Sequence, residues 1–320
     1  MNTTKSVWLS IAISLVLIGG IILVTVMGIL KWDFSKLSTY QYETNIHEIN
    51  EDIQNISIKA DTADIVFVLS EDGKCKVECY EEEKSRHSVS IEDGTLKIHL
   101  SENKKWYDYI GIGFSSPKIT LYLPKTEYTS LLINESTGDI SMPDDLCFTS
   151  VDISLSTGDV RFSASVLETL KIKGSTGSIN IANASIGYLD LTVSTGNIRL
   201  SDVKCSKDIT IGVSTGKTLL ENSSCRHFTS TGDTGSLTLT NVYIRENVFV
   251  TRSTGDIVLN DCDAAELKIK TDTGDVTGSL LSEKIFRVQT DTGSVNVPNS
   301  PIGGPCEIKT NTGDIKFILK

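Results

Sequence analysis

The chain has 320 residues, of which 39% are hydrophobic and 22% are charged, a composition that is typical of folded proteins and excludes a largely disordered chain. Its formal net charge of −11 at pH 7 disfavours binding to nucleic acid or to an anionic membrane surface. Aromatic residues make up only 7%, whereas Gly, Ser, Thr and Asp are abundant, which favours short strands and turns.

The first element is an apolar segment from Val7 to Leu30 that contains no charged residue. As a helix it is long enough to cross a hydrocarbon core of about 30 Å. It is longer than the apolar region of a signal peptide, about 7 to 15 residues, and no Ala-x-Ala cleavage motif follows it. We therefore expect an uncleaved membrane anchor.

The orientation of this anchor is weakly marked, because Lys5 precedes it while Lys31 and Lys36 follow it. Every acidic residue, and every basic residue except Lys5, lies after the segment. We expect the N-terminus inside and the large acidic domain outside, at the cell membrane.

The whole chain is expected to divide into five parts. The expected parts are a short tail at 1–6, the anchor at 7–30, a juxtamembrane linker at 31–45, a strand-rich lead-in and cap at 46–125, and repeats at 126–320.

The lead-in alternates apolar and polar residues as strands do, with turns at Asp72-Gly73 and Asp93-Gly94. Within it, "DTADI" at 61–65 is interpreted as a degenerate copy of a repeat described below. The aromatic cluster "WYDYIGIGF" at 106–114 is expected to pack over the end of the core, with a binding site as the alternative.

The most informative feature of the sequence is a Thr-Gly pair that recurs every 19 or 20 residues. The glycines are Gly138, Gly158, Gly177, Gly196, Gly216, Gly235, Gly255, Gly274, Gly293 and Gly313. Apolar residues stand seven and five positions before each glycine, except at Ser230, and two and four positions after it, except at Thr218 and Gly278. Each repeat therefore predicts two short strands that meet at a glycine corner.

Such short strands cannot bury a face alone, whereas stacked repeats can, so we predict an all-β fold: a parallel β-solenoid of about ten turns. The glycines are its structural turn positions, where the absence of Cβ allows the inward face to change. Extrapolated alternation points the preceding threonines inward. They are Thr137, Thr157, Thr176, Thr195, Thr215, Thr234, Thr254, Thr273, Thr292 and Thr312.

The triplet Asp-Thr-Gly also occurs in aspartic proteases, which bring two such carboxylates together to share a proton. In this chain Asp233, Asp272 and Asp291 occupy the same slot of the repeat as seven serines or asparagines. Asp, Ser and Asn all accept hydrogen bonds from nearby backbone amides. We interpret the three aspartates as turn residues and expect no protease activity.

A second acidic column follows the glycines, and its regularity raises the question of calcium binding. Its acidic members are Asp139, Asp159, Asp256, Asp275 and Asp314. Ser, Asn or Lys interrupts the column, and Ca²⁺ needs six to eight oxygen ligands. Solvated turn charges are the favoured interpretation, and no metal site is expected.

Cysteines and histidines suggest no cofactor and no catalytic site. The seven cysteines lack paired metal-ligand spacing and are interpreted as small buried hydrophobes, although Cys205 and Cys225 would meet if the repeats stack. His47, His87, His99 and His227 have no Ser or Cys partner recognisable by motif.

The combination of an N-terminal apolar segment, "KITLYLP" at 118–124 and the repeated "STGDI", "STGDV" and "DTGDV" is similar to a bacterial family. Over roughly residues 40–320 the chain resembles the "putative adhesin" family of uncharacterised proteins with repeated strands. Some members are linked to Gram-positive envelope-stress operons. The resemblance implies no catalytic residues.

Two functions follow from these observations. The first is a non-enzymatic, membrane-anchored surface module, adhesive or part of envelope sensing, whose partner is a cell-surface protein or glycan. The alternative is a solenoid carbohydrate-active enzyme acting on a surface polysaccharide, which would need carboxylates grouped with basic residues. No repeat position brings Arg, Lys and Asp together consistently.

The C-terminal end of the coil is expected to be uncovered. The last copy, "NTGDIKFILK", ends the chain without a helix that could cap it, and Lys316 and Lys320 would discourage edge pairing. Docking of this end on a partner is the alternative.

Overall fold

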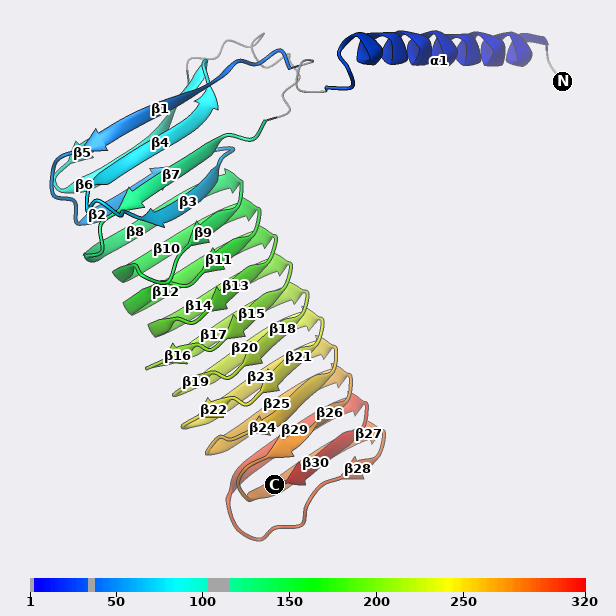
Figure 1. Ribbon diagram of the computed structural model, residues 1–320. Helices are drawn as coiled ribbons and strands as arrows, with labels where there is room; N and C mark the ends of the chain where they lie inside the picture. The colour runs from blue at the N-terminus through cyan, green and yellow to red at the C-terminus, as the bar shows by residue number, and fades with distance from the viewer. Residues whose placement is uncertain (1–2, 34–37, 103–114) are drawn as a thin grey trace.

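The structure is a computed structural model that describes residues 3–33, 38–102 and 115–320. It shows a long coil of strands with a strand-rich cap at one end and a separate helix beyond the cap (Figure 1). The predicted all-β parallel solenoid, preceded by an apolar helix, is confirmed. The aromatic cluster at 106–114 lies outside the described residues.

The helix α1, Thr3–Ile29, extends away from the cap and does not contribute to the core of the coil (Figure 1). Its segment Val7–Ile29 is long and apolar enough to cross a membrane, and its side chains are exposed apart from that of Met27. A signal sequence near an N-terminus has the same properties. The helix ends where Lys31 and Trp32 adopt positive φ and the Trp32 N–H donates to the carbonyl of Met27 at 2.8 Å.

The cap consists of two layers that close the N-terminal end of the core. One layer pairs β1 with β4 and β4 with β7, all antiparallel, and the other is the antiparallel hairpin of β5 and β6. The bounds are β1 Tyr42–Ile49, β4 Cys75–Glu82, β5 Ser85–Glu92, β6 Thr95–Glu102 and β7 Lys118–Leu123. Because β6 and β7 then pair in parallel with β2 and β3, the cap continues the coil without a break.

Between cap and repeats lies one degenerate turn, formed by β2, Asn55–Lys59, and β3, Asp64–Leu69. These strands pair in parallel with the first two strands of the repeats, and Thr62 forms a bridge to Thr137. The interpretation of "DTADI" as an early copy of the corner is therefore confirmed.

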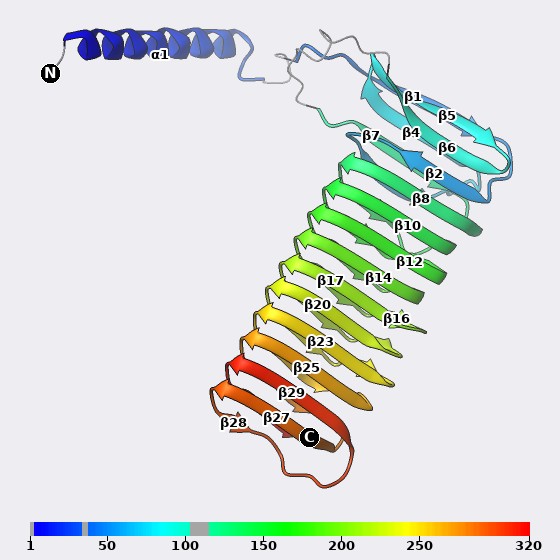
Figure 2. The same cartoon turned by 180° about the vertical axis from the view of Figure 1, so that it is seen from behind.

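Each repeat contributes one long strand before its glycine and one short strand after it. The long strands are β8 Glu127–Thr137, β10 Cys147–Thr157, β12 Ser165–Thr176, β14 Ser185–Thr195, β17 Ile209–Thr215, β20 Phe228–Thr234, β23 Asn247–Thr254, β25 Glu266–Thr273, β27 Lys284–Thr292 and β29 Gly304–Thr312. The short strands are β9 Ile140–Met142, β11 Val160–Phe162, β13 Ile179–Ala182, β15 Ile198–Ser201, β18 Thr218–Glu221, β21 Leu237–Thr240, β24 Ile257–Cys262, β26 Val276–Leu280, β28 Val295–Asn296 and β30 Ile315–Leu319. Equivalent strands pair in parallel and in register, and their long strands form one continuous face (Figure 2).

The core is a ladder of aliphatic side chains from these strands. In one turn Leu189, Leu191, Ile198 and Leu200 are each at most 1% exposed. Burying each such side chain stabilises the fold by about 1.5 to 3 kcal/mol, so the ladder is the main source of stability.

A second corner, which was not predicted from the sequence, precedes a third and shorter side of the coil. The residues at this corner are Asn183, Asp202, Asn222, Asn241 and Asp261, all with φ between 49° and 55°. Asn and Asp tolerate this left-handed conformation better than other residues with a side chain. The strands of the third side are β16 Lys204–Cys205, β19 Ser224–Cys225 and β22 Tyr243–Ile244.

The last two turns are stacked out of sequence order, in contrast to the predicted order. Strand β29 lies between β25 and β27 (Figure 2), and β30 lies between β26 and β28 (Figure 1). The prediction that the last copy forms the open end is therefore wrong. The final rung of the coil is β27 and β28, where Ile285 and Val295 are 39% and 47% exposed. The segment 297–303, with its prolines and Gly303 at φ 103°, provides the return path.

Candidate functional site

The ten corner glycines form a column along one edge of the coil, and their close stacking explains why no other residue occurs there. Their φ angles lie between +133° and +154°. A Cβ at any of them would lie 1.8 to 2.3 Å from a carbonyl oxygen of the neighbouring turn, that of Ala63 for Gly138 and of a corner glycine for the other nine. The lack of a Cβ at these glycines therefore allows the backbones of successive turns to pack closely at the corner.

The threonines before the glycines do not point inward, so that prediction is wrong. All ten are exposed, and so are the Ser, Asp or Asn residues that precede them. The long strands pair at Glu135↔Leu155 and again at Thr137↔Thr157, with the intervening serines left out of the register. Two successive outward residues thus break the alternation, and the inward column at the corner is the one that contains Glu135.

The acidic column after the glycines holds successive turns together. Asp159 Oδ1 accepts the N–H of Ser178 at 2.8 Å, and Asp159 in turn donates its N–H to Asp139 Oδ1 at 2.9 Å. The same bond joins Lys217 to Asn197, Asp275 to Asp256, Asp314 to Asp275 and Ser294 to Asp314. The interruption of this column by Asn therefore has a structural explanation, since an amide oxygen accepts the same bond.

The aspartates of the two Asp-Thr-Gly triplets near the C-terminus are not brought together. Because β29 lies between β25 and β27, Asn311 occupies the rung between Asp272 and Asp291, and its amide donates to Asp272 Oδ1 at 3.4 Å. Two rungs separate the carboxylates by about 9.6 Å of stacking. These two residues cannot share a proton as a protease pair does.

All seven cysteines are free thiols, of which six are buried and Cys147 is half-buried, as expected for small core residues. Cys205 and Cys225 occupy adjacent rungs of β16 and β19, so the expected proximity is present without a bond between them. Burial raises the pKa of Cys205 to about 11, which keeps this thiol protonated and poorly reactive at neutral pH.

The inward column at the corner contains a buried arginine. Arg252 is 3% exposed, and its guanidinium donates to Ser230 Oγ at 2.8 Å, to Thr218 Oγ1 at 3.5 Å and to the carbonyl of Thr251 at 3.2 Å. A Cβ at Gly232 would lie 2.9 Å from Arg252 Nη1, so the glycine leaves space for the guanidinium. Burial lowers the pKa of Arg252 to about 10.

This cluster explains two irregularities of the sequence pattern. Thr218 and Ser230 are breaks in the apolar positions of the repeat, and both place a hydroxyl beside the same guanidinium. The guanidinium loses its water on burial, and the two hydroxyls accept hydrogen bonds from it in place of that water. The sequence contained this signal, because the breaks and Arg252 lie in three successive repeats.

Glu135 occupies the same inward column at the junction with the degenerate turn. It is 5% exposed, its Oε1 accepts the N–H of Ala63 at 3.3 Å, and its Oε2 is buried without a partner. Burial is the main cause that raises the pKa of Glu135 from 4.5 to about 7, and the backbone N–H groups of Ala63 and Thr137 only partly oppose it.

We expect the Glu135→Gln variant to be more stable than the wild type above pH 7, by about 2 to 3 kcal/mol. The pKa of Glu135 is higher in the folded state than in the unfolded state. The contribution of Glu135 to stability is therefore most favourable below pH 4.5 and is lost as pH rises through about 7. The glutamine side chain is neutral at every pH, so the variant does not lose this stability as the pH rises. Urea unfolding of the full chain in mild detergent between pH 4.5 and 8 measures the difference.

Glu127→Gln is the matched control, because Glu127 is exposed at the start of the same strand and should leave the pH dependence unchanged. Equal pH slopes for wild type and Glu135→Gln would contradict the assignment.

An open groove crosses several turns on the third side of the coil, with a volume of about 590 Å³. Its walls include the exposed side chains of Leu167 and Tyr243, which are 53% and 55% exposed, and the basic residues Lys204 and Arg245. Arg245 Nη2 donates to the carbonyl of Ser206 at 2.7 Å, which fixes the guanidinium beside the groove. The groove combines apolar and cationic groups on a rigid support.

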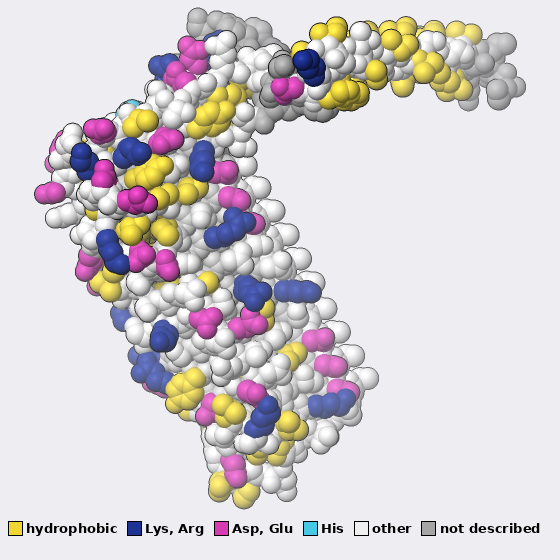
Figure 3. All heavy atoms as spheres, in the orientation of Figure 1, with side chains coloured by type: hydrophobic (Ala, Val, Ile, Leu, Met, Phe, Trp, Pro, Cys, Tyr) yellow, Lys and Arg dark blue, Asp and Glu magenta, His cyan; other side chains and the backbone are white. Residues whose placement is uncertain are grey.

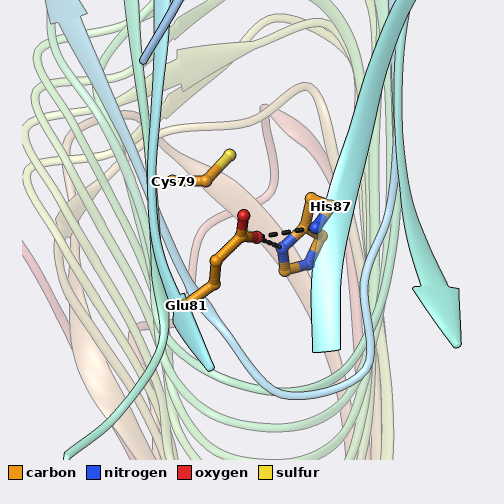
Figure 4. A group of neighbouring side chains, drawn as sticks. All are labelled: Cys79, Glu81 and His87. Carbon is orange, nitrogen blue, oxygen red and sulfur yellow. Dashed lines mark hydrogen bonds and ion pairs between the residues drawn. The ribbon is translucent and has the colours of Figure 1, made fainter. Parts of the chain in front are cut away.

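His87 belongs to a buried polar cluster in the cap that no sequence motif indicated. His87 Nδ1 lies 2.7 Å from Glu81 Oε2, and the buried thiol of Cys79 lies beside this pair (Figure 4). No motif joins these residues in the sequence. They meet only because the chain passes from one layer of the cap to the other after Glu82.

The fold and its corner column define a class, the repeat-built parallel β-solenoid that carries an N-terminal apolar helix. The sequence matches the family described as Toastrack DUF4097 over residues 53–222 and 204–320, and the chain belongs to that family. The resemblance inferred from the Ser-Thr-Gly-Asp corners is thereby confirmed. No curated protein matches the chain.

Several solved bacterial structures are similar to this chain at low sequence identity. A "putative adhesin" from Parabacteroides merdae is 15% identical with a TM-score of 0.47, covering 87% of this chain and 96% of its own. A "putative lipid binding protein" from Parabacteroides distasonis is 16% identical with a TM-score of 0.45, covering 87% and 98%. A "putative adhesin" from Bacteroides fragilis is 16% identical with a TM-score of 0.43, covering 87% and 97%.

Proposed function

We propose that this protein is a non-enzymatic surface module, anchored in the cell membrane by α1 and presenting its solenoid outside the cell to a protein or glycan of the envelope. The observation that carries the proposal is that α1 is exposed over Val7–Ile29, apart from Met27, while the core of the solenoid is formed without it. An isolated apolar helix of this length is stable where hydrocarbon surrounds it.

The surface of the solenoid supports an aqueous location for this part of the chain. Apolar side chains cover α1, whereas acidic and basic side chains are interspersed over the visible face of the coil (Figure 3). A net charge of −11 for the chain favours solubility and disfavours adsorption to anionic lipid headgroups. A rigid rod on a single anchor suits the display of a binding face at a distance from the membrane.

The groove on the third side is the surface that we assign to the partner. It offers Tyr243 and Leu167 as apolar contacts beside Lys204 and Arg245. Aromatic and arginine side chains are the residues that most often dominate the binding energy of interfaces.

The test places a photo-crosslinking amino acid at Tyr243 in cells that produce the full chain, with the same substitution at Phe249 as the matched control. Phe249 is also apolar and partly exposed, at 39%, but lies on the long-strand side. We expect a defined crosslinked product from position 243 and none from position 249. Mass spectrometry of the product then identifies a protein or a glycan.

Protease added to cells without a wall tests the orientation. Degradation of the solenoid in intact cells is the expected result. Complete protection until the membrane is opened would refute the proposed location, and equal crosslinking from both positions would refute the assignment of the groove.

A further inference from the structure

The cap contains three potential metal ligands of different chemistry in one buried cluster. Cys79 and Glu81 alternate on β4 and therefore share its inward face, while His87 faces them from β5 (Figure 4). The thiol sulfur, a carboxylate oxygen and a ring nitrogen lie within 4.8 Å of one another. Cys79 is 0%, Glu81 1% and His87 6% exposed.

From this geometry we propose that Cys79, Glu81 and His87 bind a divalent transition-metal ion of the zinc type. Sulfur, imidazole nitrogen and carboxylate oxygen are the ligands that Zn²⁺ takes in proteins, at about 2.0 to 2.3 Å. Ligand atoms around a tetrahedral ion then stand about 3.3 to 3.8 Å apart, so the cluster needs only small side-chain shifts.

Charge balance favours an ion at this depth. One thiolate and one carboxylate neutralise a divalent cation, so the loaded site carries no net charge in a buried setting. On binding, the proton of the Cys79 thiol is released to solvent, and the proton of a neutral His87 moves from Nδ1 to Nε2. The sulfur, oxygen and nitrogen atoms each donate an electron pair, and no redox step occurs.

The second ring nitrogen of His87 is free to carry the proton that Nδ1 gives up when it binds the ion. His87 Nε2 is buried and has no hydrogen-bond partner among the described residues, which costs about 1 to 3 kcal/mol in the present state. His87 also lines a pocket of about 280 Å³ together with Ser85 and Leu100. When Nδ1 binds the ion, Nε2 carries the ring proton and donates it to water in this pocket.

The surroundings of Glu81 orient its carboxylate in the way that second-layer residues orient metal ligands. Asn45 Nδ2 donates to Glu81 Oε1 at 2.9 Å and to Glu43 Oε1 at 2.9 Å, while the His87 N–H donates to Glu81 Oε2 at 2.6 Å. Arg86 in turn lies 2.5 Å from Glu43. Asn45 is therefore a positioning residue for the proposed site.

The test uses the full chain in mild detergent after removal of metal with a chelator. Addition of Co²⁺ is expected to give the near-ultraviolet charge-transfer band of a cobalt–thiolate bond at one ion per chain, and Zn²⁺ is expected to abolish the band. Competition with a coloured chelator gives the Zn²⁺ affinity. We expect Cys79→Ser or His87→Gln to weaken it about 100-fold or more, and Asn45→Ala about 10-fold.

Cys75→Ala is the matched control, because Cys75 lies on the same face of the same strand outside the cluster and its loss should leave the band and the affinity unchanged. Circular dichroism shows whether each variant is folded. Absence of the cobalt band in the wild type would overturn the proposal whatever the variants do, and so would a folded Cys79→Ser variant with wild-type affinity. Neither result bears on the surface role proposed above.

Discussion

Replacing Gly235 with alanine is expected to destabilise the protein by at least about 3 kcal/mol. The new Cβ would lie 1.9 Å from the carbonyl oxygen of Gly216 and 2.6 Å from its carbonyl carbon. Backbone atoms cannot rotate away as a side chain can, so two adjacent turns must separate. Their separation weakens the strand pairing on both sides of the corner.

Gly212→Ala provides the matched control within one turn of the same site. A Cβ at Gly212 meets nothing closer than 3.8 Å, and its φ is compatible with any residue. We expect this variant to be as stable as the wild type or more stable by about 0.5 kcal/mol, since alanine costs less conformational entropy than glycine in a strand. Urea unfolding of the full chain in mild detergent measures both, and equal stability of the two variants would refute the role of the corner.

The second large effect is expected at the buried guanidinium. Replacing Thr218 with Val and Ser230 with Ala removes two hydroxyl acceptors from Arg252 and should lower stability by about 3 to 5 kcal/mol, because a buried cation is left without them. Each hydroxyl makes its bond inside the coil, where water cannot replace it. Chemical denaturation followed by circular dichroism measures the loss.

A compensating change distinguishes this explanation from simple loss of packing. Adding Arg252→Val to the two substitutions places a valine at this position. Valine already occupies the equivalent buried position in two earlier turns, as Val193 and Val213. We expect the triple variant to recover to within about 1.5 kcal/mol of the wild type, because the charge has gone along with its acceptors. A triple variant as unstable as the double one would show that the hydroxyls act in another way.

The fold could be predicted because one physical requirement repeats along the chain. Ten glycines at a nearly constant spacing, each flanked by alternating apolar residues, leave stacking as the means of burying them. The threonines were misplaced because alternation was extrapolated through the corner, where the structure has two outward residues in succession. The second corner was also readable, since Asn183, Asp202, Asn222, Asn241 and Asp261 recur with the period of the glycines.

Other features depend on contacts between distant segments, which no local pattern specifies. The repeats are so similar in sequence that the pattern does not indicate which turns are neighbours in space. The exchange of the last two rungs was therefore not predictable. The Cys79, Glu81 and His87 cluster required knowledge of how β4 and β5 face each other across the cap. The Arg252 cluster was partly predictable, because the residues that supply its hydroxyl partners were visible in the sequence as breaks in the apolar pattern.

The exchanged rungs have a consequence for the assembly of the molecule. Since β29 separates β27 from β25, residues 284–296 cannot reach their final neighbour before residues 304–319 have left the ribosome. Growth of the rod by simple templating on the preceding turn therefore stops at β26. Strands β29 and β30 dock on β25 and β26, and β27 and β28 then pair with them, so the order of assembly at this tip differs from the order of synthesis.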